Sequence, residues 1–353
     1  MTKRMLLALT AIAIGAAALL WAGARYVTAV PGSAHTGPLP ALADAEAATA
    51  TRLATHIKAI ASRPHNIAHY ADLETAARYI EAELTALGYK PQLQVFQVDG
   101  RDVRNIEAVI EPSDPAASRG TIVVGAHYDS FVDAPGANDN GTGTAAVIEL
   151  ARLLADLRGR SGARIRLILF VNEEPPYFRT PDMGSYRYAR LLAERRESVI
   201  GMMSLETLGC FSDEPGSQRY PAPLGLLYPD KGDFIAFVAT PGSRALMQAL
   251  VGSFRSHTQF PTVGGVAPAI IPGIDWSDHR SFEQFGYPTA MITDTALFRY
   301  SHYHRPTDTP DKVDNEKLAR IVHGIARVVR DMTGPDWPTA ATPPPAQHVS
   351  PTR

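Results

Sequence analysis

A buried strand that runs directly into polar residues constrains the fold of this chain more than any other stretch. Residues 121–124 (Thr-Ile-Val-Val) form a β-branched run that is typical of a buried strand. His127 and Asp129 follow it, and Asp139 lies in a glycine-rich loop before a helix that we expect over residues 144–157. Open α/β sheets bind their ligands beyond the carboxyl ends of strands. A metal site is therefore one reading of these residues, although a histidine at a strand end is more often structural.

The remainder of the chain alternates between predicted helices and predicted strands. Hydrophobic periodicity predicts helices over residues 44–61, 72–87, 185–194, 243–255 and 315–332, and strands over 92–98, 103–110, 164–171, 199–205 and 287–293. Asp99-Gly100 is a hairpin signal between the first two strands. Such alternation predicts an α/β fold, a three-layer sandwich whose central, mostly parallel sheet is flanked by helices.

The N-terminal residues 1–27 predict an export signal or a single membrane anchor. Lys3 and Arg4 precede an uncharged, apolar stretch over residues 5–23. Its length and Trp21 favour a retained anchor, whereas the small residues of Ala22-Gly23-Ala24 suit cleavage by a signal peptidase. Either outcome places the body of the protein outside the cytoplasm, membrane-anchored in the first case and periplasmic or secreted in the second.

Composition divides the rest of the chain and limits its chemistry. We expect a Pro/Gly/Ala-rich linker over residues 28–43, a folded domain over 44–333 and a Pro-rich, disordered tail over 334–353. The 353 residues are 45% apolar, enough for a substantial core, and a net charge of -2 without basic runs argues against nucleic-acid binding. Because Cys210 is the only cysteine, a metal must be held by His, Asp and Glu.

Acidic or histidine residues also accompany other predicted strands. Asn172-Glu173-Glu174 ends one strand, and Glu206 ends the next. Ser277-Asp278-His279 precedes the strand over 287–293, and a segment over 302–309 with two histidines follows it. One such residue is weak evidence, but the joint pattern predicts a catalytic crevice.

In chain order, these motifs resemble those of the co-catalytic di-zinc aminopeptidase family. The motifs are His-Tyr-Asp-Ser, Gly-Ala-Asn-Asp-Asn-Gly-Thr-Gly, Asn-Glu-Glu, Leu-Glu, Ser-Asp-His and Tyr-His-x-x-x-Asp-Thr, over about residues 45–333. Relatives within that family include bacterial leucyl aminopeptidases, glutamate carboxypeptidases, glutaminyl cyclases and the catalytically inert transferrin receptor ectodomain.

The resemblance implies two Zn²⁺ per chain. The ligands it implies are His127 and Glu206 for one zinc, Glu174 and His304 for the other, and Asp139 as the bridge. Glu173 is then the general base, and Asp129 orients His127 by a hydrogen bond. Three ligand carboxylates and one hydroxide balance the four positive charges of two Zn²⁺, which lessens the cost of burying the site.

Three features depart from the family pattern. The family commonly has Asp where this chain has Glu206, whose carboxylate is also a valid ligand. A longer loop over residues 175–183 separates the Glu pair from Gly184-Ser185, and we expect it to shape the substrate pocket. His302 and His304 are both candidates for the last ligand, and the motif register selects His304. Asp278 and His279 are expected beside the metals, with local capping as the alternative.

The implied activity is that of an exported zinc-dependent exopeptidase. It would hydrolyse the N-terminal residue of peptides with a free N-terminus, through a hydroxide bridging two zinc ions. A single-zinc glutaminyl cyclase, which would not need His127, and an inert binding ectodomain remain alternatives. So does a carboxypeptidase of small acidic peptides, which would need a cationic pocket from Arg219, Arg299 or Arg305.

Overall fold

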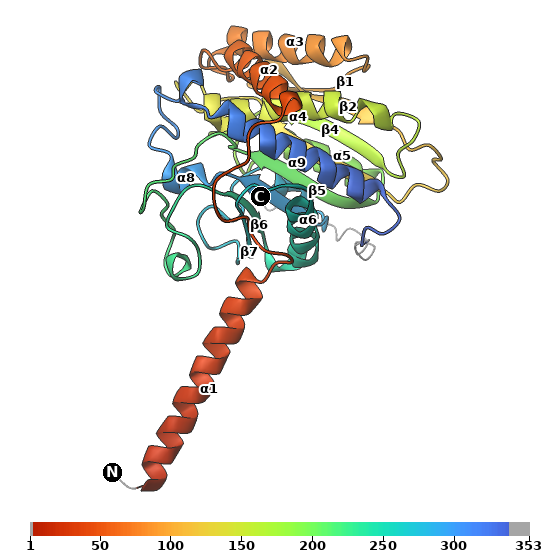
Figure 1. Cartoon of the computed structure of the whole chain (residues 1–353). Helices are drawn as coiled ribbons and strands as arrows, with labels where there is room; N and C mark the ends of the chain where they lie inside the picture. The colour runs from red at the N-terminus through yellow and green to blue at the C-terminus, as the bar shows by residue number, and fades with distance from the viewer. Residues whose placement is uncertain (1–2, 339–353) are drawn as a thin grey trace.

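One mixed sheet of eight strands organises the computed structural model, which describes residues 3–338 (Figure 1). The strands are β1 (Gln92–Val98), β2 (Arg101–Ile110), β3 (Thr121–His127), β4 (Arg164–Phe170), β5 (Val199–Glu206), β6 (Ile235–Ala239), β7 (Thr262–Val266) and β8 (Thr289–Thr293). Their order is β1-β2-β4-β3-β5-β8-β6-β7. The central strands β4, β3, β5 and β8 are mutually parallel, and β2 and β6 join this block in antiparallel orientation. The predicted, mostly parallel sheet is thus confirmed.

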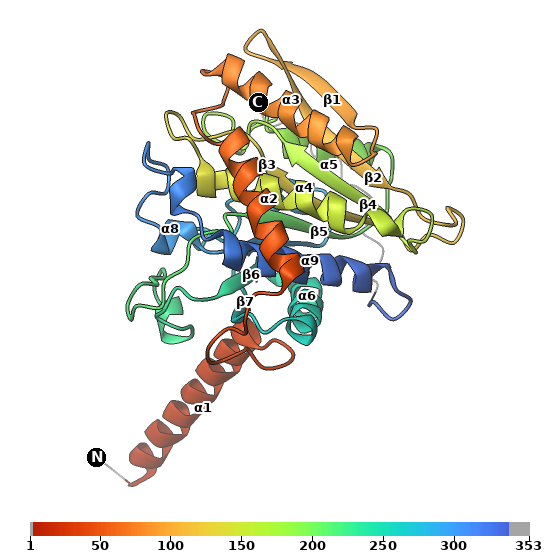
Figure 2. The ribbon, with the colours of Figure 1, turned by 45° about the horizontal axis from the view of Figure 1, so that its top comes forward.

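Helices cover both faces of the sheet (Figures 1 and 2). They are α2 (Asp44–Ile60), α3 (Tyr70–Ala86), α4 (Thr142–Leu153), α5 (Gly184–Glu194), α6 (Arg244–His257), α7 (His279–Glu283), α8 (Ala296–Arg299) and α9 (Asn315–Thr333). Successive residues of β3 point to opposite faces, as strand geometry requires. Ile122 and Val124 join the large core that α2, α4, α6 and α9 cover, whereas Val123 joins a smaller core with Tyr188 of α5 and Phe282 of α7. Three layers result, as predicted.

Local sequence explains the predicted β1–β2 hairpin and the weak strand signal of β7. Asp99 and Gly100 both have positive φ, 49° and 72°, which is the geometry of a tight hairpin turn between β1 and β2. The sequence analysis did not identify β6 and β7, which have five residues each. In β7 two of the five residues, Gly264 and Gly265, lower the strand propensity.

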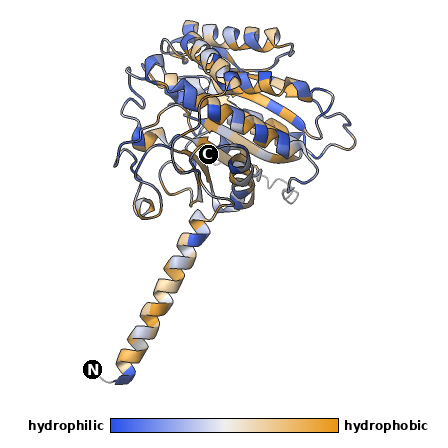
Figure 3. Cartoon of the chain, viewed as in Figure 1, coloured by the Kyte–Doolittle hydropathy of each residue, from blue (hydrophilic) through white to orange (hydrophobic). Residues whose placement is uncertain are grey.

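The helix α1 (Lys3–Thr28) stands apart from the sheet and its covering helices (Figures 1 and 2). Within residues 3–338 it is the one helix long and apolar enough to cross a membrane, and by length and composition it also suits a signal sequence. Figure 3 shows that the residues along this helix are mostly hydrophobic and that hydrophilic residues lie near both of its ends. Residues 29–43 form no helix or strand and run across the domain, where Gln248 of α6 and Arg320 of α9 donate to the carbonyls of Ala29 and Pro40. Most of the predicted disordered tail, residues 339–353, lies outside the described residues.

Candidate metal centre

The carboxyl ends of the parallel strands bring the candidate ligands together. His127 is the last residue of β3 and Glu206 the last of β5. Glu174 follows β4, and His304 follows β8. Asp139 enters from the loop Ala137–Gly141 that precedes α4. Because parallel strands end at the same edge of a sheet, residues far apart in sequence converge there.

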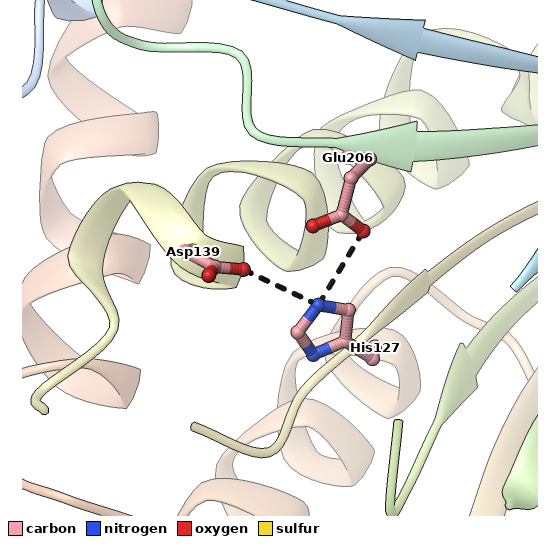
Figure 4. Close-up of side chains that lie close together, drawn as sticks. All are labelled: His127, Asp139 and Glu206. Atoms are coloured by element: carbon pink, nitrogen blue, oxygen red, sulfur yellow. Dashed lines mark ion pairs between the residues drawn. The ribbon is translucent and has the colours of Figure 1, made fainter. Parts of the chain in front are cut away.

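The five side chains form two groups that share Asp139. His127 Nε2 lies 3.4 Å from Asp139 Oδ1 and 3.4 Å from Glu206 Oε2, with the imidazole between the two carboxylates (Figure 4). His304 Nε2 lies 3.0 Å from Asp139 Oδ2 and 3.3 Å from Glu174 Oε1. Each oxygen of Asp139 therefore faces a different group, which is the arrangement of a bridging carboxylate.

Several atoms at the centre of this cluster are buried without a hydrogen-bond partner. They are His127 Nε2, both carboxylate oxygens of Asp139, and Glu174 Oε1. Buried polar atoms in proteins are nearly always hydrogen-bonded, so orphaned atoms that converge on one place indicate a ligand. Imidazole nitrogen and carboxylate oxygen are donors that Zn²⁺ accepts. The residues present therefore fit a zinc centre.

The electrostatics of the cluster also favour a cation. Burial raises the pKa of the Glu174 carboxyl to about 8, and the neighbouring Asp139 carboxylate adds to this rise while His304 opposes it. Burial alone would lower the pKa of His127, but the carboxylates of Glu206 and Glu173 raise it well above its ordinary value. The excess of buried carboxylates thus favours protonated histidine and carboxyl groups at this cluster. Bound divalent cations would supply the positive charge that these protons otherwise bring.

Asp308 fixes the loop that carries Asp139. Its Oδ1 accepts the backbone N–H of Asn138 at 2.9 Å, and its Oδ2 accepts that of Asp139 at 3.1 Å. The hydroxyl of Tyr300 donates to Oδ1 at 2.8 Å. The sequence analysis quoted this aspartate within a motif without a role, and its role here is to hold the bridging residue in place.

Asp129 occupies a similar supporting position beneath the Glu pair. Its carboxylate accepts the backbone N–H groups of Glu173 at 3.0 Å and Glu174 at 3.1 Å. His127 Nδ1 lies 3.0 Å from the Asp129 carbonyl oxygen and 3.7 Å from Oδ1, so the backbone is its nearer partner. Glu173 Oε2 lies 3.9 Å from His127 Nε2. Glu173 therefore lies beside the candidate ligands, and with His127 and Glu174 it forms a further group of possible ligand atoms.

Glu206, which departs from the family pattern, and the neighbouring Asp278 and His279 take distinct positions. Glu206 Oε2, the atom that faces His127, accepts a hydrogen bond from Ser277 Oγ at 2.7 Å. Asp278 is buried with no partner for either carboxylate oxygen, and burial raises its pKa to about 7. His279 Nε2 is paired instead with the Ile274 carbonyl at 2.9 Å.

His304 is held between two aromatic rings. Phe131 and Tyr303 stack on its opposite sides, each with a centroid distance of 3.9 Å. His302 instead lies 2.8 Å, Nδ1 to Oγ1, from Thr307 and belongs to neither ligand group. The sequence analysis missed Phe131 and quoted Tyr303 within a motif without giving its ring a role.

Left-handed backbone conformations surround the cluster. Asn172 after β4, Thr207 after β5 and Thr295 after β8 have φ of 61°, 54° and 61°, and His304 has φ of 57°. Non-glycine residues in this region cost about 1–3 kcal/mol each and concentrate at functional sites. Three of the four central parallel strands, β4, β5 and β8, are thus followed by sharp turns where the candidate ligands lie.

An apolar cavity of about 110 Å³ begins at the cluster. Glu206 and Tyr303 line it, and its walls also include Phe234, Phe237, Val266, Met291, Trp276 and Phe298. The loop over 175–183 contacts a segment of the cavity wall through Arg179, which donates a hydrogen bond to Asp275 at 2.7 Å. In the sequence, Asp275 stands between Ile274 and Trp276, which both line the cavity.

Solved structures show which fold this is. An aminopeptidase from Aneurinibacillus sp. strain AM-1 superposes with a TM-score of 0.64 at 17% identity, covering 86% of this chain and 99% of that one. A glutaminyl cyclase from Porphyromonas gingivalis gives 0.59 at 17% identity, covering 82% and 100%. The chain therefore has an aminopeptidase-like fold, with buried nitrogen and oxygen donors at the ends of its parallel strands. The model of peptidase family M28 matches residues 105–329, so the chain belongs to this zinc-dependent metallopeptidase family.

Curated relatives agree with that membership. The uncharacterized protein YfbL of Escherichia coli K12 is 36% identical over 271 residues, which are 74% of this chain and 81% of that protein. Leucine aminopeptidase 1 of Arthroderma otae is 26% identical over 266 residues, 70% of this chain and 64% of the relative. The chain therefore spans just under two thirds of that aminopeptidase.

Proposed function

We propose that this protein is an aminopeptidase that holds two Zn²⁺ and removes the N-terminal residue of peptides. The observation that carries the proposal is the position of Asp139, whose two oxygens face separate ligand groups. A single-metal site would need only one of those groups. His127 and Glu206 would hold one zinc and His304 and Glu174 the other.

When bound, the two metals would polarise the scissile carbonyl and make the attacking water more acidic. Glu173 takes a proton from that water and delivers it to the departing amine, which is the work of a general acid/base group. Asp129 holds the backbone of Glu173 and Glu174 through two hydrogen bonds, so the base and the adjacent ligand keep separate positions. Burial of these groups excludes competing solvent from the reacting atoms.

The apolar cavity is the proposed binding place for the side chain of the N-terminal residue. Its volume of about 110 Å³ is several times the roughly 10–15 Å³ that a cavity needs to hold one water molecule. The cavity therefore has room for a side chain. Apolar walls favour a large apolar side chain and disfavour a charged one, because a charge would lose its hydration there. We therefore expect preference for leucine, methionine or phenylalanine at the N-terminus.

The alternative activities have less support. Arg299, one of three candidates for a carboxypeptidase pocket, already donates to Gln218 Oε1 and to the Cys210, Gly232 and Phe234 carbonyls. A glutaminyl cyclase would leave His127 without a ligand role. An inert ectodomain would not need the complete donor set.

We further propose that α1 is retained as an anchor and that the domain lies outside the cytoplasm. The end of α1 and the residues after it are bonded to α6, which supports a helix that belongs to the mature molecule. The full-length protein should then fractionate with membranes and need detergent for release. An N-terminus found near Arg25 would instead indicate cleavage.

A substrate panel tests the activity. Leucyl, phenylalanyl, lysyl and glutamyl peptides should be compared with N-acetyl-leucyl peptides and with peptides that begin with glutamine. The proposal predicts release of free amino acids from unblocked N-termini, fastest for the apolar residues. Cleavage of the acetylated peptides, or conversion of N-terminal glutamine to pyroglutamate without hydrolysis, would contradict it.

A further inference from the structure

The most exposed apolar side chains of the described domain lie on two segments whose neighbouring residues, Leu224 and Pro272 among them, line the apolar cavity. Leu226 is 87% and Ile270 88% exposed, above every other large apolar side chain recorded as exposed among residues 3–338. Leu227, Trp276 and Leu297 are also exposed, at 37–40%. We call these five residues the rim surface. Single exposed apolar residues are ordinary, but a group of them marks a surface that binds something apolar.

The rim surface borders the mouth of the apolar cavity. Trp276 and Leu297 line the cavity directly, as does Leu224, which precedes the exposed leucines. The loop over residues 220–228 begins and ends in tyrosines, Tyr220 and Tyr228, whose rings stack with centroids 5.8 Å apart. These rings close the base of the loop and leave its leucines projecting outward.

The same cavity reaches the end of α1. Val27 of α1 lines it together with Tyr228, whose hydroxyl donates to the Gly264 carbonyl of β7 at 3.3 Å. A Cβ on Gly264 would lie only 2.7 Å from Val30 Cγ1, so glycine is what lets the segment after α1 lie against β7. Figures 1 and 2 both show the loop around η3 (Leu224–Leu226) on the side of the domain from which α1 leaves.

Polar contacts fix α1 to the domain instead of leaving it a free tether. Arg244 Nε donates to the Tyr26 carbonyl at 3.1 Å, and its guanidinium lies 4.7 Å from the centroid of the Tyr26 ring. Gln248 Nε2 donates to the Ala29 carbonyl at 2.6 Å. Arg255 Nη1 donates to the carbonyl of Pro31 at 3.0 Å. The position of α1 in a bilayer would therefore determine the position of the domain.

The length of α1 places the cavity close to that bilayer. Trp21, a residue suited to the membrane interface, lies six residues before Val27, or about 9 Å along a helix. Each headgroup layer is about 5–8 Å thick. The end of the cavity at Val27 would then lie at the outer edge of the headgroups.

We propose that the rim surface is a second membrane contact, which inserts Leu226 and Ile270 into the headgroup layer of the bilayer that α1 crosses. Leucine, isoleucine and tryptophan are residues that interfacial elements bury there, and the surface is continuous with the proposed anchor. The proposal rests on α1 being retained. Its consequence is that the cavity opens at the lipid surface, so the peptides best placed to reach the metal centre are those whose apolar N-terminal residues lie on the membrane.

Depth-dependent quenching in vesicles tests this contact without any need for activity. The full-length chain, with Cys210→Ser, would carry one environment-sensitive fluorophore at Leu226→Cys or Ile270→Cys and be reconstituted in phosphatidylcholine vesicles. Val95→Cys is the matched control, because Val95 is 57% exposed on β1 at the opposite edge of the sheet from β7. Reconstitution in vesicles should blue-shift the emission of the labels at 226 and 270, and brominated lipids should then quench it, whereas the label at 95 should show neither effect.

Three results would overturn the proposal. Equal, weak quenching at all three positions would mean that the rim surface faces water. A blue shift that needs a high protein-to-lipid ratio and is insensitive to bromination would mean that a second copy of the chain covers it. Recovery of the chain in the soluble fraction, cleaved before Tyr26, would remove the anchor on which it depends.

A kinetic comparison separates this proposal from the proposed activity. The Leu226→Asp/Ile270→Asp variant should hydrolyse a soluble leucyl peptide at the normal rate and lose rate on a leucyl peptide carrying a C-terminal lipid. Loss on both substrates would point to damage to the cavity. Normal rates on both would show that membrane contact does not serve catalysis, while the proposed peptidase activity would still stand.

Discussion

Two buried glutamates in this protein show opposite behaviour. Glu149 on α4 is 1% exposed, and its carboxylate accepts hydrogen bonds from Arg52 and Arg152 at 2.7–3.1 Å, with His56 Nε2 3.5 Å away. Burial would raise its pKa, but these partners lower it to about 2. Glu174 is 3% exposed, and burial raises its pKa to about 8, with the neighbouring Asp139 carboxylate adding to the rise.

The difference lies in where the compensating charge comes from. The cluster around Glu149 is complete within the chain, since guanidinium groups satisfy both oxygens of the carboxylate. The cluster around Asp139 contains several carboxylates and two histidines, and several of its inward-facing atoms have no partner. A buried charge that the chain balances is structural, whereas one that it leaves unbalanced is a place for a cation.

The largest expected effect is on the unbalanced cluster. His304→Ala removes the only nitrogen donor of one group, so hydrolysis should fall close to background and one metal should be lost. His302→Ala is the matched control, because His302 bonds only to Thr307 nearby and should change the rate little. Initial rates and metal content of both variants check this. The reverse order of severity would mean that the ligand lies two residues earlier.

A smaller effect separates the two acids of the Glu pair. Glu173→Gln keeps the shape of the side chain but cannot accept a proton, so kcat should fall about 10²–10⁴-fold with metal content and KM nearly unchanged. Glu174→Gln should lose metal as well as rate, because a neutral amide is a poor ligand for zinc. Steady-state kinetics and metal analysis on the same samples distinguish these outcomes. Loss of zinc only in Glu173→Gln would mean that base and ligand are exchanged.

Local patterns predicted much of this site because each part of it is local in sequence. Residue patterns in the sequence identify the hydrophobic run of β3, the glycine-rich loop and the start of α4. The parallel arrangement of the strands then brings their ends together. Register within a short motif selected His304, whose Nε2 lies beside Asp139 and Glu174, and its role as a ligand stays a prediction.

Contacts between distant segments could not be predicted in this way. Nothing near Phe131 in sequence indicates that it stacks on His304, and nothing near Asp308 indicates that it holds the backbone of Asp139. The edge strand β7 was missed because its glycines serve the docking of the segment after α1, a tertiary contact that overrides strand propensity.

The balanced cluster should affect stability and leave activity intact. Glu149→Gln would leave Arg52 and Arg152 without their carboxylate, at a cost of about 1–3 kcal/mol, since both guanidiniums remain partly exposed. Glu194→Gln, at an exposed i,i+4 pair with Arg190, is the matched control and should change the free energy of unfolding far less, because solvent screens that pair. Urea denaturation gives the free energies of unfolding. A metal-loaded Glu149→Gln variant that is fully stable but inactive would contradict the comparison.

The smallest effect is a pH dependence of stability. The pKa of Glu149 is about 2 in the folded protein, against an ordinary value of 4.5, so its contribution is present above pH 4.5 and is lost as pH falls toward 2. The difference in free energy of unfolding between wild type and Glu149→Gln should therefore shrink as pH falls through that window. A difference that stays constant or grows would mean that the carboxylate is not stabilised by its partners.

The metal content of the full-length protein tests the central claim most directly. After exhaustive dialysis against metal-free buffer, elemental analysis should find two zinc ions per chain in the wild type and in Glu149→Gln. A strong chelator should abolish hydrolysis, and added zinc should restore both metal and rate. One zinc per chain, or undiminished hydrolysis in protein shown to be metal-free, would contradict the two-zinc account.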